Sequence, residues 1–109
     1  MKVAIPIVSA NRNSKLSLRF ARSNYFAVVD VDTGNYHIIE NPYTDLQMQA
    51  GKNSLEMLIH KENVDTLIAF ELGLKIQQYA ARSNIRLILL NDAKKTLDTL
   101  LKLMRIAAI

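Results

Sequence analysis

The residues best suited to chemistry in this sequence are cations that gather just before a strongly apolar segment. Lys15, Arg19 and Arg22 fall within eight residues, and no acidic residue lies among them. Phe20 lies between the two arginines, and residues 25–31 (YFAVVDV) follow shortly afterwards. Such a segment is either a solvated loop, as polar loops usually are, or the rim of a site for an anionic ligand. The residues alone leave both interpretations open.

Residue types that bind metals are scarce in this chain. There is no cysteine, and the histidines are His37, in a predicted strand, and His60, near the end of a predicted helix. Iron–sulfur clusters are held chiefly by thiolates and sometimes by imidazoles, and both histidines stand where a structural role is expected. Among the methionines, only Met48 lies in a predicted loop where its weakly ligating thioether is accessible. We predict no metal-ligating site and no tightly bound iron or zinc in the purified protein.

The sequence contains no recognisable catalytic motif either. A nuclease of the two-metal type needs carboxylates gathered on central strands. Residues 3–8 contain none, and Asp30 and Asp32 stand only at the end of the next strand. The sequence contains no recognisable Ser-His-Asp arrangement and no phosphate-binding P-loop. It therefore predicts a protein that is not an enzyme.

Composition and charge narrow the class of protein further. A chain of 109 residues with 50% hydrophobic and 22% charged residues is expected to form one domain, residues 1–109. The net charge of +4 favours anionic partners, but it is spread along the chain and forms no nucleic-acid-binding tail. No apolar run reaches the roughly 18 residues of a membrane span, and the first residues do not resemble a signal peptide. A cytoplasmic protein that binds neither membrane nor nucleic acid is predicted.

Short apolar runs predict the strands that position these residues. Residues 3–8, 64–70 and 85–90 have the composition of strands that are buried on both faces. Residues 25–31 and 36–40 flank a turn that contains a glycine, so a hairpin is expected there.

Three helices are expected between and after these strands. The first is predicted to begin at an Asn53 cap, with Glu56 at capping-box spacing, and to end near residue 61. The second covers residues 73–82, and the third follows a Thr96 cap with apolar residues at helical spacing. This order of elements predicts an α/β fold of three layers, with a mixed five-stranded sheet of order 3-2-1-4-5 in the ribonuclease H-like arrangement.

Several segments resemble one protein family in order and spacing. The chain opens with MKVAIPI, continues with LSLRFARSNYFAVVDVDTG, and then has IIENP. This series resembles the dinitrogenase iron–molybdenum cofactor biosynthesis family over essentially the whole chain. The matching positions are Phe20, Arg22, Tyr25, Phe26, Asp30, Glu40, Asn41 and Pro42. The resemblance implies a ribonuclease H-like fold and a non-enzymatic role, in which an iron–sulfur or iron–molybdenum cofactor, or its precursor, is held during cofactor assembly.

The sequence departs from the family pattern at places that concern the ligand. Arg19 stands where the family has a histidine, and Ala21 stands where it has a glycine. The glycine-rich loop of the family is here residues 46–51, with a single glycine. In open α/β sheets, ligands gather beyond the carboxyl ends of the parallel strands. The crevice predicted at that end contains Ser9, Asn11, Arg12, Arg19, Phe20, Arg22, Met48, Gly51, Glu71 and Gly73.

Two functions remain open at this point. The first is a carrier that holds an anionic metal cofactor or precursor in the basic crevice and works with a cofactor-assembly protein. The second is a protein-interaction module of the same fold that has lost cofactor binding. A monomer or a weak homodimer is expected in either case.

Overall fold

A computed structural model describes residues 1–92 and 94–104 of the chain. Its centre is a five-stranded sheet with the order β3-β2-β1-β4-β5. The strands are β1 (Lys2–Ile7), β2 (Tyr25–Asp30), β3 (Asn35–Glu40), β4 (Thr66–Ala69) and β5 (Arg86–Leu89). β1, β4 and β5 run parallel, whereas β2 pairs antiparallel with both β1 and β3. The predicted mixed sheet and its strand order are confirmed.

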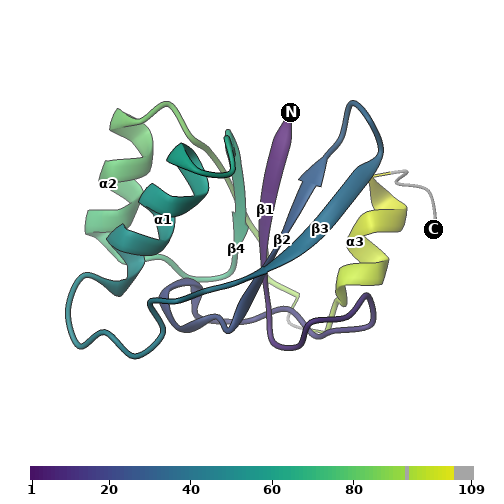
Figure 1. Ribbon diagram of the computed structural model, residues 1–109, viewed down its shortest axis with the longest axis horizontal. Coiled ribbons are helices and arrows are strands. Elements are labelled where there is room, and N and C mark those ends of the chain that lie inside the picture. The colour runs from purple at the N-terminus through teal and green to yellow at the C-terminus, as the bar shows by residue number, and fades with distance from the viewer. Residues whose placement is uncertain (93, 105–109) are drawn as a thin grey trace.

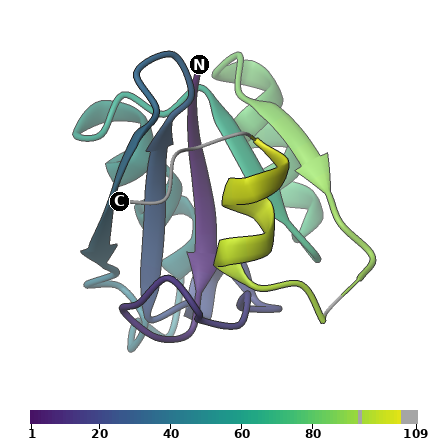
Figure 2. The same cartoon turned by 90° about the vertical axis from the view of Figure 1, so that its right-hand side faces the viewer.

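Helices cover both faces of this sheet and complete the three layers. The helices α1 (Ala50–His60) and α2 (Leu74–Arg82) lie together on one face, and α3 (Leu97–Leu103) lies on the other (Figures 1 and 2). A short 3-10 helix, η1 (Phe20–Arg22), precedes β2 and contacts α1. The cationic segment is therefore placed beside the helix pair.

The side chains of β1 alternate between two apolar clusters, one on each face of the sheet. Val3, Ile5 and Ile7 are buried with the apolar side of α3. Ala4 faces the other way and is buried with Phe26 and the apolar sides of α1 and α2. Because successive side chains of a strand point to opposite faces, a strand that is apolar throughout must be covered on both. The composition of β1 thus accounts for its central position.

The first helix begins earlier than predicted. Ala50 is its first residue, and Gln49 occupies the N-cap position with a left-handed backbone (φ 61°) and no side-chain capping hydrogen bond. Asn53 lies inside the helix, where its side-chain amide donates to the Gln49 carbonyl oxygen at 2.9 Å. The interpretation of Asn53 as the N-cap residue is wrong, because its amide bonds back to the preceding turn and does not cap a new one.

The last strand is less buried than predicted. Arg86, Ile88 and Leu89 of β5 are exposed, and Leu89 retains 53% of its accessible surface. β5 has a neighbouring strand on one side only. The expectation of a strand buried on both faces is therefore wrong for β5, because an apolar run does not reveal whether its strand lies at the edge of the sheet.

The last helix begins as predicted. The Thr96 hydroxyl oxygen accepts a hydrogen bond from the backbone N–H of Thr99 at 3.3 Å, as an N-cap residue does. Leu97, Leu100 and Leu101 are buried against the sheet. No helix within residues 1–92 and 94–104 is long and apolar enough to cross a membrane.

A candidate anion-binding groove

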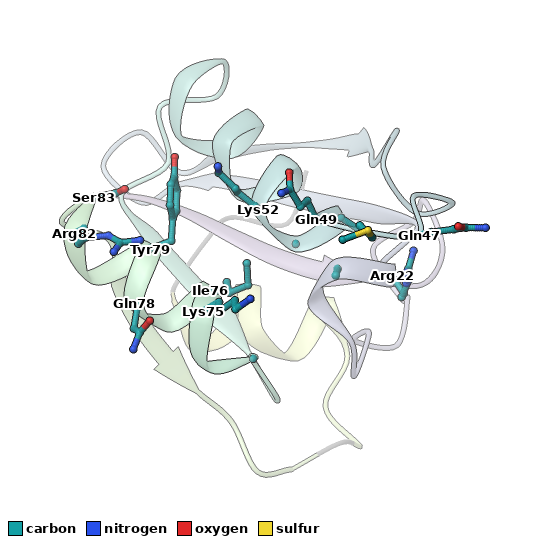
Figure 3. A pocket seen from close by; sticks show the side chains of 15 residues that line it. Arg22, Gln47, Gln49, Lys52, Lys75, Ile76, Gln78, Tyr79, Arg82 and Ser83 are labelled. Atoms are coloured by element: carbon teal, nitrogen blue, oxygen red, sulfur yellow. The ribbon is translucent and has the colours of Figure 1, made fainter.

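A groove of about 800 Å³ opens between the first turn of α1 and the length of α2. Its lining comes from η1, the loop before α1, the first turn of α1 and much of α2 (Figure 3). The residues of the lining are Ala21, Arg22, Gln47, Met48, Gln49, Ala50, Gly51, Lys52, Gly73, Lys75, Ile76, Gln78, Tyr79, Arg82 and Ser83. The groove therefore gathers segments that are far apart in the sequence.

The charged residues that line this groove all have the same sign. They are Arg22, Lys52, Lys75 and Arg82, and none of the described lining residues is acidic. Just outside the lining, Glu56 offsets part of this charge in an i,i+4 pair, in which the Lys52 ammonium lies 4.0 Å from a carboxylate oxygen of Glu56. Cations that gather without acids raise the local concentration of anions by several-fold or more. The groove is thus electrostatically suited to an anionic ligand.

The first turns of α1 and α2 both contribute residues to the lining of this groove. Neither α1 nor α2 has an acidic residue in its first turn, and neither N-cap side chain accepts a hydrogen bond from the helix. Lys52 and Lys75 stand in those first turns instead, where the helix dipole disfavours a positive charge. Backbone N–H groups of a first turn have no partner within the helix and suit an anion. An anion in the groove would satisfy both the N–H groups and the lysines.

The two glycines of the groove play different roles. A Cβ atom on Gly51 would lie 3.0 Å from Cδ1 and 3.1 Å from Cγ1 of Ile76, so Gly51 is what allows α1 to approach α2. A Cβ atom on Gly73 would meet nothing within 4 Å, and the backbone there has an ordinary negative φ of −60°. Gly73 therefore leaves the mouth of the groove open.

Arg22 holds the loop that forms one wall of the groove. Its Nη1 donates to the carbonyl oxygens of Thr44 at 2.6 Å and Leu46 at 2.5 Å. These bonds fix the guanidinium at the groove and fix the backbone that leads to Met48, whose side chain is 79% exposed. Arg22 is therefore both a charge of the site and a support of its wall.

Tyr79 supplies a hydroxyl to the groove. Burial raises the pKa of the Tyr79 phenol, and the negative charge of Glu56 raises that pKa further. The phenol therefore stays protonated at neutral pH, and the Glu56 carboxylate competes with any bound anion for its hydrogen bond.

A smaller cavity of about 470 Å³ adjoins the groove. It shares Ala21, Arg22, Gly73 and Ile76 with the groove and adds Arg19, Phe20, Glu71 and Leu72. Arg19 and Glu71 lie side by side as a parallel bridge. Because the Glu71 carboxylate offsets one of its cations, this cavity attracts anions less strongly than the groove does.

The structure brings most of the predicted site residues together. Those that line the groove or the adjoining cavity are Arg19, Phe20, Arg22, Met48, Gly51, Glu71 and Gly73. Ser9, Asn11 and Arg12 line neither of them. Ser9 and Asn11 serve their own turn, in which the Ser9 N–H donates to Ser14 Oγ at 2.9 Å and Asn11 Oδ1 accepts from the Asn13 N–H at 2.9 Å.

Arg12 is engaged elsewhere. Its Nε donates to Asp98 Oδ1 at 2.5 Å, and its guanidinium lies 5.9 Å from the ring centre of Tyr36. Asp98 belongs to α3, which lies on the face of the sheet opposite α1 and α2 (Figure 2). Arg12 therefore ties its loop to α3.

The sequence analysis missed Lys52, Lys75, Tyr79 and Arg82. Tyr79 and Ile76 pack partly buried against the apolar cluster on this face of the sheet, and both also line the groove. A signal was present for the lysines, because a helix with a lysine and no acid in its first turn runs against the usual preference. The first turns of two such helices line one groove here.

Direct metal ligation is poorly supported by the lining of the groove. It contains no histidine, aspartate, glutamate or cysteine, and Met48 supplies its only sulfur atom. Within residues 1–92 and 94–104, no three residues of those types are grouped so as to hold a metal ion. His37 lies elsewhere, with Nε2 at 2.7 Å from Glu62 Oε1. A metal cluster that brought its own ligands and a negative charge would fit; a bare metal ion would not.

Together, the fold and the groove define an α/β protein with a basic groove lined by two of its helices. Residues 1–105 match the family model described as dinitrogenase iron-molybdenum cofactor, and the chain belongs to this family. A search of curated proteins found no relative that matches the sequence.

Solved structures support the fold. The apo form of the orange protein from Desulfovibrio gigas is similar with a TM-score of 0.83 and 22% sequence identity, over 93% of this chain and 83% of that one. A putative NifB protein from Thermotoga, solved by NMR, is similar with a TM-score of 0.76 and 26% identity, over 95% of this chain and 86% of that one.

Proposed function

We propose that this protein is a non-enzymatic carrier that holds an anionic cofactor of the iron–sulfur or iron–molybdenum type, or a precursor of one, in the groove between α1 and α2. The observation that carries the proposal is the set of four cations around the groove without an acidic neighbour in its lining. Membership of the iron–molybdenum cofactor family supports the chemical class of the cargo. The two helix N-termini support its negative charge.

The residues of the groove would hold such a cargo through its outer atoms. Lys52 and Lys75 would neutralise sulfide or carboxylate groups on it, and each charge-assisted hydrogen bond contributes about 1.5–3 kcal/mol. The Tyr79 hydroxyl and the free N–H groups of the helices would donate to the remaining acceptors. No protein–metal bond would need to be broken for release, which suits a carrier that passes its cargo to an assembly protein.

The lining also supports a role without catalysis. General acid–base and nucleophilic catalysis use histidine, carboxylate, cysteine, lysine, tyrosine or a base-activated hydroxyl. The described lining contains none of the first three types, and its lysines and its tyrosine have no histidine or carboxylate among the lining residues to work with. This composition favours binding over catalysis.

The test uses tetrathiomolybdate, a simple anion of molybdenum and sulfur, added to the purified protein under anaerobic conditions. Equilibrium dialysis with molybdenum analysis measures the dissociation constant. The variant Lys52→Gln/Lys75→Gln should bind at least about tenfold more weakly, since two charge-assisted contacts are lost. The matched control is Lys61→Gln, which removes an exposed lysine just beyond the opposite end of α1.

Equal binding by the double variant and the native protein would contradict the groove as the site. No binding of tetrathiomolybdate by the native protein, together with no uptake of iron and sulfide on anaerobic reconstitution, would contradict the carrier function. The second function, an interaction module of the same fold without a cofactor, would then describe the protein better.

A further inference from the structure

One edge of the sheet is largely apolar, with Arg86 as the one charged residue of its strand. Among residues 1–92 and 94–104, no strand lies beside β5 on its outer side (Figure 2), and Ile88 and Leu89 keep 39% and 53% of their surface exposed. Natural edge strands are usually blunted by inward-pointing charges, prolines or bulges. The opposite edge, β3, exposes Asn35, His37 and Glu40. β5 is thus the edge that favours pairing with another strand.

The backbone of β5 presents free hydrogen-bonding groups on its outer side. The N–H groups of Arg86 and Leu90 donate inward, to the carbonyl oxygens of Asp65 at 3.0 Å and Ala69 at 2.8 Å. Because N–H and C=O directions alternate along a strand, those of Leu87 and Leu89 point outward. These groups are available to an added strand.

We propose that two copies of this protein associate through β5, with the two strands antiparallel about a twofold axis that passes through Leu89. In this register Leu89 forms a hydrogen-bonded pair with Leu89 of the partner subunit, and Leu87 pairs with Asn91 of the partner subunit. The outward-pointing groups of Leu87 and Leu89 are the ones that such a pairing uses. The two sheets join into one continuous sheet.

Charge complementarity selects this register and this partner. Arg86 comes to lie directly opposite Asp92 of the partner subunit, and both residues are exposed in the single chain. Centring the axis on Leu87 also matches the outward-pointing groups, but it places Arg86 opposite Ile88 of the partner subunit. Two copies of the segment 86–92 (RLILLND) aligned antiparallel therefore place opposite charges together at both ends of the pair. This self-complementarity is what favours a second copy over an unrelated strand.

Apolar contacts support the same register on both faces of the sheet. Leu89 pairs in register with Ala69 and lies on the face of α1 and α2, so two Leu89 side chains meet there. Ile88 pairs with Ile68 on the face of α3 and comes to lie opposite Leu90 of the partner subunit. Directly opposed apolar pairs each contribute about 0.2–1 kcal/mol.

The association is expected to be weak and compatible with a loaded groove. One short strand pair buries less surface than the roughly 1,200 Å² of a specific, stable interface. None of the residues that line the groove belongs to β5. The dimer can therefore form whether or not the groove holds a ligand.

Sedimentation velocity over a range of protein concentrations provides the first test. The native protein should show reversible self-association, and Leu89→Glu should weaken it about tenfold or more, because two like charges then face each other at the axis. Leu103→Glu is the matched control, since Leu103 is a similarly exposed leucine on α3 (65% exposed). A native protein that stays monomeric at all concentrations, or a Leu89→Glu variant that associates equally well, would overturn the proposal.

Disulfide trapping tests the register itself. The chain has no cysteine, so a single substitution introduces the only thiol. Residues that form a hydrogen-bonded antiparallel pair have Cα atoms about 5.5 Å apart, within the range of a disulfide. Leu89→Cys should therefore form a covalent dimer on mild oxidation much faster than Leu103→Cys. Equal rates for the two variants would contradict pairing at Leu89.

Discussion

At the scale of single residues, anion binding in the groove is expected to depend on the lack of a side chain at Gly73 as well as on the cations. Gly73 is the N-cap residue of α2, and a Cβ atom there would meet no neighbour within 4 Å. Aspartate is among the best N-cap residues, slightly better than glycine. A glycine at this place keeps negative charge away from the mouth of the groove.

Gly73→Asp should separate ligand binding from stability. The new carboxylate should raise the free energy of unfolding by a few tenths of a kcal/mol, as a better cap. It should weaken tetrathiomolybdate binding by about tenfold or more, because it repels the anion at close range. Gly73→Asn has the same shape without the charge and should bind like the native protein. Urea unfolding and equilibrium dialysis measure the two effects, and equal binding by both variants would contradict an anionic ligand at α2.

Sequence reasoning identified one of the four cations that line this groove. Arg22 was predicted because it stands in a segment without acids. Lys52 and Lys75 were not, because their significance comes from the meeting of two helices that are separated in the sequence. Arg12 was placed in the crevice by its position after β1, but its pairing with Asp98 of α3 could not be read from the sequence.

At the scale of elements, the contact between α1 and α2 determines the shape of the groove. Gly51 in the first turn of α1 faces Ile76 of α2, and the absence of a side chain on Gly51 sets the distance between the helices. An alanine is ordinarily better than a glycine inside a helix by about 0.5–1 kcal/mol. Here that gain is opposed by steric overlap.

Gly51→Ala should therefore have opposite effects in two backgrounds. In the native protein we expect it to lower the free energy of unfolding by about 1 kcal/mol, because the added methyl group overpacks Ile76. In Ile76→Ala, where the opposing atoms are gone, it should raise stability by about 0.5–1 kcal/mol. Urea unfolding of the four proteins gives the coupling energy. The same effect in both backgrounds would mean that the helix contact is not what requires glycine.

A second element, α3, is attached to the sheet partly by charge. Hydrogen bonds from Arg12, which has the larger effect, and from Lys102 lower the pKa of the Asp98 carboxylate from the ordinary value of 3.8. A carboxylate whose pKa is lower in the folded than in the unfolded state stabilises the fold at pH values above its unfolded-state pKa. That stabilisation is lost as the pH falls through its folded-state pKa.

Asp98→Asn should accordingly make the protein less sensitive to acid. The native protein should lose stability as the pH falls below about 4, because protonation of Asp98 breaks its pairing with Arg12. The variant lacks this proton linkage and should lose less over the same interval. Asp45→Asn, at an exposed carboxylate in the loop before α1, is the control. Urea midpoints measured at neutral and acid pH give the comparison, and equal acid sensitivity of the Asp98→Asn variant and the native protein would contradict the linkage.

The elements themselves were largely predictable from the sequence. The apolar runs fixed the strands, and the hairpin and the crossovers fixed their order, because few topologies satisfy the usual connection rules. The start of α1 was not predicted, since Gln49 adopts a left-handed backbone that its residue type does not favour. The exposure of β5 depends on its position at the sheet edge, which follows from the whole topology and not from its own residues.

At the scale of the whole molecule, the distribution of charge matters more than its sum. The net charge is only +4, yet four cations border one groove without an acid in its lining. Acidic residues stand elsewhere, as Asp98 does on the opposite face of the sheet. The field at the groove is therefore stronger than the net charge suggests.

The dependence of anion binding on salt concentration should test this positive potential at the groove. In 0.5 M salt the Debye length falls from about 10 Å at 0.1 M to about 4 Å, so anion binding in the open groove should weaken markedly. Tetrathiomolybdate should raise the melting temperature of the native protein at low salt, since a ligand that binds only the folded state stabilises it. The increase should shrink in 0.5 M sodium chloride, and it should be small at either salt concentration in Lys52→Gln/Lys75→Gln. A ligand-induced increase that is independent of salt would indicate binding through apolar contacts or direct metal ligation, and would contradict charge as the basis of recognition.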